Sequence, residues 1–168
     1  YAVTAIAANA FENCNALHTL TIPTSIQSIG NSAFAQCKKL KTIYYNAIQC
    51  ANLGTYNYVF QSAGQDTTGM RVVISSKVTN IPSNLFYPAS FAMYKPNLDS
   101  VQWLGTSSCT TIGENAFRMT SIRTITIPAS ITIIGATAYK DCTSANKIIL
   151  YPTQPPAVTY TIMAGVNT

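Results

Sequence analysis

Apolar residues recur along the chain in units of 22 to 31 residues, each marked by one aromatic residue. The marker aromatics are Phe11, Phe34, Phe60, Phe86, Phe117 and Tyr139, and their successive spacings are 23, 26, 26, 31 and 22 residues. Self-similarity at this period is typical of a solenoid, in which each repeat packs against its neighbours. The longer central spacings predict loop insertions that make the middle repeats irregular.

Each unit also contains a segment with the pattern L-x-x-L-x-I, in which apolar and polar residues alternate as in a short strand. The apolar positions of these segments are Leu17/Leu20/Ile22, Leu40/Ile43/Tyr45, Gly69/Val72/Ile74, Leu98/Val101/Trp103, Ile122/Ile125/Ile127 and Ala145/Ile148/Leu150. Strands that recur once per repeat in one orientation pair in parallel. The sequence therefore predicts a one-strand-per-repeat parallel sheet of about six rungs.

The residues after each strand predict how the chain leaves the sheet. Pro23 and Pro128 have no N–H for a ladder and should end their strands. We expect Gly30, Gly113 and Gly135 to supply a positive φ in the following turn. A short helical or 3-10 turn should then run from the marker aromatic toward the end of the unit.

Two continuous runs, 17–37 and 122–142, match L-x-x-I-x-I-P-x-S-V-x-x-I-G-x-x-A-F-x-x-C. The chain therefore resembles the leucine-rich repeats of the BspA-like type, also called the Treponema pallidum type. The resemblance covers essentially the whole chain, with insertions at 44–60 and 81–88. It implies a leucine-rich repeat solenoid, which is a right-handed superhelix with a parallel sheet on one side.

The ends of the chain suggest that 1–168 is a single leucine-rich repeat domain and a fragment of a longer surface protein. Residues 1–11 read as a half repeat whose strand is missing. The segment from about 151 to 168 carries Pro152, Pro155 and Pro156, which cannot extend a sheet, and it resembles the closing segment of this family.

The marker aromatics should stack as a buried structural spine, because equivalent residues of successive rungs lie one strand spacing apart. Cys14, Cys37 and Cys142 each follow a spine aromatic by three residues, which predicts one buried column. Cys14 and Cys37 fall on adjacent rungs, where the alternatives are a disulfide and side-by-side thiols, and the thiols are the preferred interpretation. Cys109 should occupy another buried column, whereas Cys50 lies in an insertion and is expected to be the most exposed.

The amino-acid composition narrows the classes of function that the chain can have. Charged residues make up 9% of the chain, against roughly 25% in ordinary globular proteins, so Thr, Ser, Asn and Gln must form the surface. No apolar stretch is long enough for membrane insertion. The ten basic residues, which give a net charge of +5, are scattered and form no stripe for nucleic acid.

Catalytic chemistry has no support in the sequence. His18 is the only histidine and should point outward from its strand, away from the cysteine columns. No phosphate-binding, zinc or nucleophile motif is present, and the acidic residues occupy unrelated repeat positions. We therefore expect no enzyme activity, no catalytic residue, no metal and no cofactor. The acidic residues are Glu12, Asp66, Asp99, Glu114 and Asp141.

The outward face of the sheet is the candidate binding surface. Its expected members are His18, Thr19, Thr21, Lys41, Thr42, Tyr44, Met70, Arg71, Val73, Asp99, Ser100, Gln102, Arg123, Thr124, Thr126, Asn146, Lys147 and Ile149. The residues proposed to bind a partner are Lys41, Tyr44, Arg71, Gln102, Arg123 and Lys147. Their basic character favours an acidic protein patch or an anionic glycan. The alternatives are a plain solvated face and a site in the aromatic insertions, which contain Tyr44, Tyr45, Tyr56, Tyr58, Tyr87, Phe91 and Tyr94.

The resemblance implies a secreted or cell-surface bacterial protein that adheres to host matrix proteins or neighbouring cells. We expect a monomer. The alternative function is a carbohydrate-binding or architectural repeat region attached to a secreted enzyme, in which tyrosine-rich loops would stack on sugar rings.

Overall fold

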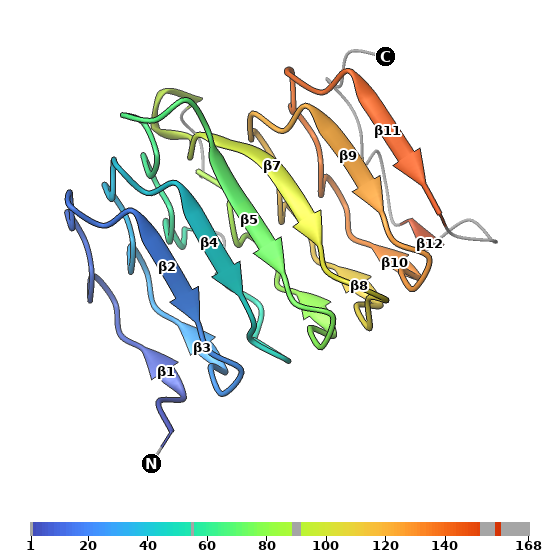
Figure 1. Cartoon of the computed structure of the whole chain (residues 1–168), viewed down its shortest axis with the longest axis horizontal. Coiled ribbons are helices and arrows are strands. Elements are labelled where there is room, and N and C mark those ends of the chain that lie inside the picture. The colour runs from blue at the N-terminus through green and yellow to red at the C-terminus, as the bar shows by residue number, and fades with distance from the viewer. Residues whose placement is uncertain (1, 55, 89–91, 152–156, 159–168) are drawn as a thin grey trace.

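The computed structural model describes residues 2–54, 56–88, 92–151 and 157–158. Its longer strands are β2 (Thr19–Ile22), β4 (Thr42–Tyr45), β5 (Met70–Ile74), β7 (Leu98–Trp103), β9 (Thr124–Ile127) and β11 (Lys147–Leu150). They lie side by side in chain order and point the same way (Figure 1). These strands confirm the predicted strand segments and their parallel pairing. The four strands β2-β4-β5-β7 form one ladder, and β9 and β11 form another.

A second set of short strands lies behind the first (Figure 1). They are β1 (Ala5–Ile6), β3 (Ser28–Ile29), β6 (Asn80–Ile81), β8 (Thr111–Ile112), β10 (Ile133–Ile134) and β12 (Ala157–Val158). They also pair in parallel, in the orders β1-β3 and β12-β10-β8-β6. The structure thus adds a second strand where the sequence predicted a turn, because stacked rungs let this extended segment bond to its neighbours. Of the expected closing segment, Tyr151 and Ala157–Val158 are described.

Glycines at the ends of the short strands do not have the expected positive φ; that prediction was wrong. Positive φ glycines are Gly64, Gly69 and Gly105 instead. A Cβ at Gly30 would lie 2.3 Å from the backbone nitrogen of Ala8 on the preceding rung. A Cβ at Gly113 would lie 2.4 Å from the backbone nitrogen of Ser83. These positions therefore require glycine because the backbones of successive rungs approach closely there.

The segment around each spine aromatic forms hydrogen-bonded turns. The expected short helix is absent from these described segments, and the 3-10 helix η1 spans Ala92–Tyr94. Ser32 and Gln36, two residues before and after Phe34, have φ of 54° and 60°. The Phe34 N–H donates to Val59 O at 2.9 Å, and the Gln36 N–H donates to Gln61 O at 2.8 Å. Backbone hydrogen bonds between rungs therefore take the place of the hydrogen bonds that would continue a helix.

The aromatic spine is confirmed. Successive rings from Phe11 to Tyr139 stack with centroids 5.0 to 5.6 Å apart and planes within 20° of parallel. Phe34 and Phe117 are fully buried, and the apolar residues that alternate inward along β4, β5 and β9 are buried as well. Leu150 of β11, which the sequence placed inward, is instead 62% exposed. Phe11 is 47% exposed because it belongs to the first rung and stacks on Phe34 alone.

All five cysteines are free thiols. Cys37 and Cys142 are buried and donate to the carbonyl oxygens of Phe11 and Phe117 at 3.2 and 3.1 Å. Cys109 is buried as predicted. Cys14 was also predicted to be buried but is partly exposed, because it follows Phe11 on the first rung.

Cys50 contradicts its prediction, since its exposed fraction is 2%. The Ala51 N–H donates to Gln27 O at 2.9 Å, which aligns Cys50 with buried Ile26 on the preceding rung. The insertion therefore continues an interior column. Burial raises the pKa of the Cys50 thiol, which makes it a poor nucleophile.

Candidate binding surface

Strand register places two rows of outward side chains on the four-stranded sheet. Neighbouring members of a row lie on paired strands, about 4.8 Å apart. The first row is Thr19, Thr42, Arg71 and Ser100. The second row is Thr21, Tyr44, Val73 and Gln102. The backbone ladder fixes the mutual positions of these side chains, so a partner meets a surface that is already ordered.

The structure divides the predicted binding residues into two groups. Lys41, Tyr44, Arg71 and Gln102 belong to the four-stranded sheet, where Lys41 directly precedes β4. All of them are exposed, and Tyr44 has an exposed fraction of 38%. Arg123 and Lys147 lie with the β9–β11 pair. The structure therefore brings four of the predicted residues together and sets two apart.

Arg123 contributes less positive charge than the sequence suggested. Its Nε lies 2.8 Å from Oδ1 of Asp99, and its side chain is 69% exposed. This ion pair offsets the charge of Arg123 at the border of the four-stranded sheet. The basic character of that sheet therefore comes from Lys41 and Arg71.

Two expected outward residues are buried. Met70 is fully buried because it fills the inward position that the sequence analysis gave to Gly69, and pairs with Leu98. A register shift between Met70 and Arg71 absorbs the one-residue difference. Val73 does lie on the outward row but is only 4% exposed, between Tyr44 and Gln102 in the register.

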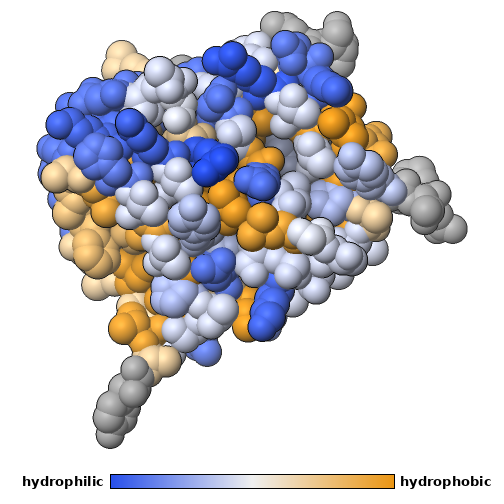
Figure 2. All heavy atoms as spheres, viewed as in Figure 1, coloured by the Kyte–Doolittle hydropathy of each residue, from blue (hydrophilic) through white to orange (hydrophobic). Residues whose placement is uncertain are grey.

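Polar side chains gather at one end of the sheet. Figure 2 shows hydrophilic surface over the ends at which β2, β4 and β5 begin, and apolar patches nearer the middle. Exposed Lys38 and Lys39 come two to three residues before Lys41, just ahead of β4 in the chain. Neither lysine was among the predicted binding residues because both precede the strand, although two consecutive lysines in a chain with few charges could have marked them.

The aromatic insertions do not form one cluster of exposed rings. Tyr45 is fully buried, whereas Tyr56 is 72% exposed. Tyr87 is partly buried and lies under Arg118, whose Cζ is 5.0 Å from the ring centroid. Phe91 lies outside the described residues. Tyr44 is therefore the insertion aromatic that joins the sheet surface.

The ladder breaks between β7 and β9, which belong to different sheets. At one end the Arg123 N–H still donates to Asp99 O at 3.2 Å. Farther along, Nε1 of Trp103 donates to Thr126 O at 3.1 Å, so a side chain bridges the two strands. A groove of about 810 Å³ lies beside this bridge. Its lining is Val101, Gln102, Trp103, Gly105, Thr106, Ser107, Thr126, Pro128, Ala129, Ser130 and Tyr151.

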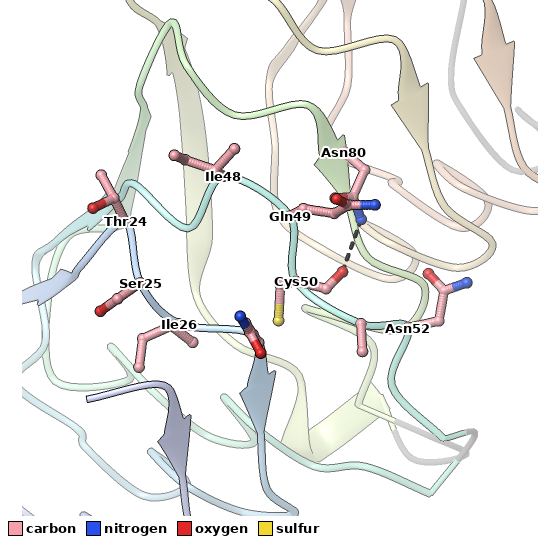
Figure 3. A pocket seen from close by; sticks show the side chains of 10 residues that line it. Thr24, Ser25, Ile26, Ile48, Gln49, Cys50, Asn52 and Asn80 are labelled. Atoms are coloured by element: carbon pink, nitrogen blue, oxygen red, sulfur yellow. Dashed lines mark hydrogen bonds between the residues drawn. The ribbon is translucent and has the colours of Figure 1, made fainter. Parts of the chain in front are cut away.

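A second pocket, of about 570 Å³, lies between the segments 24–27 and 48–52 of neighbouring repeats (Figure 3). Asn80 reaches it from the next rung, and its Nδ2 donates to Cys50 O at 2.9 Å. Asn80 Oδ1 is buried without a hydrogen-bond partner among the described residues. The lining is polar and uncharged, with Cys50 buried at its inner wall, so nothing in it activates a nucleophile.

Titratable side chains do not converge on a reaction centre in the part of the chain that the structure describes. His18 is exposed, and its Nδ1 lies 2.8 Å from Ala16 O. No group of three or more His, Cys, Asp or Glu side chains is placed to hold a metal among these residues. Nor does the same part of the chain contain a helix long and apolar enough to cross a bilayer.

The family model described as BspA type leucine rich repeat region matches the chain in six copies, over residues 1–102 and 66–154. No curated protein matches the chain significantly.

Solved bacterial structures resemble the chain over most of its length. A leucine rich cell surface protein from Faecalibacterium prausnitzii A2-165 is 26% identical, with a TM-score of 0.53, over 94% of this chain and 45% of that protein. A leucine-rich repeat protein from Bacteroides ovatus ATCC 8483 is 23% identical, with a TM-score of 0.60, over 90% of this chain and 35% of that protein. The chain thus spans less than half the length of either structure.

Proposed function

The chain belongs to the BspA-type leucine-rich repeat family, and from that premise we propose that it is an extracellular protein-binding module of a bacterial surface protein. The similarity to the cell surface protein from Faecalibacterium prausnitzii supports this location. The role is binding without catalysis, and the module acts as a monomer. Its partners are host matrix or cell-surface proteins.

The binding surface in this proposal is the outward face of the four-stranded sheet. The observation that carries it is the register that holds Tyr44, Arg71 and Gln102 on adjacent paired strands, with Lys41 directly before β4. Little conformational entropy is lost when a partner meets side chains on a rigid ladder. Exposed Lys41 and Arg71 favour a partner with an acidic patch.

Charge reversal on this face tests the proposal. Lys41→Glu with Arg71→Glu should weaken binding to an immobilised matrix protein by about 1 kcal/mol or more, because two attractions become repulsions. Stability should change by about 0.5 kcal/mol or less, since both side chains are exposed. Affinity for the unsubstituted chain should also fall as salt rises.

The matched control is Lys77→Glu with Lys140→Glu, which changes the net charge equally but lies outside the long strands. Equal weakening by both pairs would show a response to net charge alone. Unchanged binding in the Lys41 and Arg71 variant, with folding intact, would remove this face from the proposal.

A carbohydrate-binding role is the second candidate function. The specific observation that favours it is the uncharged groove between β7 and β9, which contains an aromatic side chain and several hydroxyl groups.

A further inference from the structure

The groove between β7 and β9 differs in chemistry from the basic end of the sheet. None of its lining residues is charged, although Arg123 and Asp99 pair nearby. Its volume of about 810 Å³ falls within the range of small-ligand sites. We propose that this groove binds a neutral oligosaccharide. This inference rests on the second candidate function, carbohydrate binding, and specifies its ligand class. It is independent of the protein-binding proposal, and Gln102 is the residue that the two surfaces share.

The lining offers the two kinds of contact that a neutral sugar requires. Trp103 and Tyr151 supply aromatic faces for the C–H side of a sugar ring. The hydroxyl groups of the lining can exchange hydrogen bonds with sugar hydroxyls, and they belong to Thr106, Ser107, Thr126 and Ser130. An anionic glycan or an acidic peptide would find no cation among these residues, and burying its charge there would be costly.

The Trp103 ring and the backbone of Tyr151 are held before a ligand arrives. The hydrogen bond from Trp103 Nε1 to Thr126 O fixes the indole across the break in the ladder. Tyr151 is anchored through its backbone, because its N–H donates to Ile127 O at 3.0 Å, while its side chain stays 60% exposed. A ligand that stacks on Trp103 therefore has little side-chain order to impose on that ring.

Ser130 is the second observation that points to a ligand. Its Oγ is buried and has no hydrogen-bond partner among the described residues. A buried hydroxyl without a partner is uncommon in a folded protein, and it marks a place where a bound group or water completes the hydrogen bonding. Ser130 lines the groove, and a rotation of its side chain toward the groove would bring this covered Oγ to a sugar hydroxyl.

Tryptophan fluorescence can test this proposal directly, because Trp103 is the only tryptophan in the sequence. Its fluorescence can be followed while the whole chain is titrated with gluco-, xylo-, manno- and galacto-oligosaccharides of about two to four sugars. We expect at least one series to change the emission saturably. The midpoint should not depend on salt, because neither partner carries charge at the contact.

Substitutions then locate the site. Tyr151→Ala should weaken the binding of that oligosaccharide roughly tenfold through the loss of one stacking face, and Ser130→Ala should weaken it several-fold. The matched control is Tyr56→Ala, which removes another exposed tyrosine and should leave affinity unchanged. Melting curves of each variant verify that the fold persists.

Three results would overturn the proposal. One is that no neutral oligosaccharide changes Trp103 emission or binds on an array of neutral glycans. Another is full affinity in Tyr151→Ala and Ser130→Ala together. The third is that an uncharged extended peptide, and no sugar, produces the saturable change, which would assign the groove to strand addition beside β7.

Discussion

The column of close-packed glycines makes a sharp prediction about the spacing of the rungs. A Cβ built on Gly113 would lie 2.4 Å from the Ser83 nitrogen and 2.8 Å from its Cα. The Gly113 N–H also donates to Ile81 O at 2.8 Å, so the two rungs are held together where the methyl group would enter. Gly113→Ala must push these rungs apart by about 1 Å to reach an ordinary contact distance.

The cost of this displacement follows from what the two rungs share. Overpacking of a well-packed interior costs about 1–3 kcal/mol, and weakening one hydrogen bond between rungs adds about 1 kcal/mol. The Phe86 and Phe117 rings stack at 5.6 Å on the same pair of rungs and resist separation. We therefore expect Gly113→Ala to lower the free energy of unfolding by about 3 kcal/mol, a large part of the 5–15 kcal/mol typical of a domain.

Urea unfolding monitored by Trp103 fluorescence and circular dichroism measures this loss. The matched control is Gly54→Ala, because a Cβ there meets no atom within 4 Å. Alanine at such a site restricts the unfolded chain and should leave stability unchanged or slightly higher. Gly30→Ala should cost less than Gly113→Ala, since Gly30 contacts the first rung at Ala8, which has fewer neighbours to hold it. A loss of less than about 0.5 kcal/mol in Gly113→Ala would refute the steric argument.

Three further predictions concern the spine and the thiols. Phe117→Ala should lower the free energy of unfolding in urea by about 3–5 kcal/mol. Phe11→Ala should lower it far less, because Phe11 lies on the first rung and is 47% exposed. Equal losses in the two variants would contradict this difference between an inner and an end rung. Native thiol labelling should modify Cys14 ahead of buried Cys37 and Cys109, and rapid modification of all three would contradict burial. Burial raises the pKa of Cys37 and of Cys109 to about 11. Between about pH 9 and 11 the unfolded chain therefore binds fewer protons than the folded chain, so the free energy of unfolding should fall as pH rises through that window; a constant urea midpoint would contradict this.

Repeated positions were the part of the fold that the sequence could predict. An aromatic at a steady interval must face the same environment on each rung, so the spine from Phe11 to Tyr139 followed from spacing alone. The six strand segments followed from alternation for the same reason. Cys109 was placed correctly because it shares its position with Ile26 and Ile131.

Features that depend on contacts between rungs were not visible in a single unit. The glycine column was noticed, but a turn with positive φ and a close backbone approach select the same residue. Cys50 was misplaced because the insertion hides its alignment with Ile26. The break beside Trp103 had no signal, since a tryptophan at an inward strand position looks like core until its indole is seen bonded to Thr126.

Irregular repeats offer this fold places for recognition that regular ones do not. Each rung bonds only to its neighbours, so a local irregularity need not disturb the stack on either side. The register shift at Met70 and Arg71 and the break after β7 lie in consecutive repeats. Phe117 follows β7 and Tyr139 follows β9, and their rings still stack across this break with centroids 5.2 Å apart. The spine therefore keeps the rungs together while the sheet opens, and it is at this opening that Trp103 becomes accessible to a ligand.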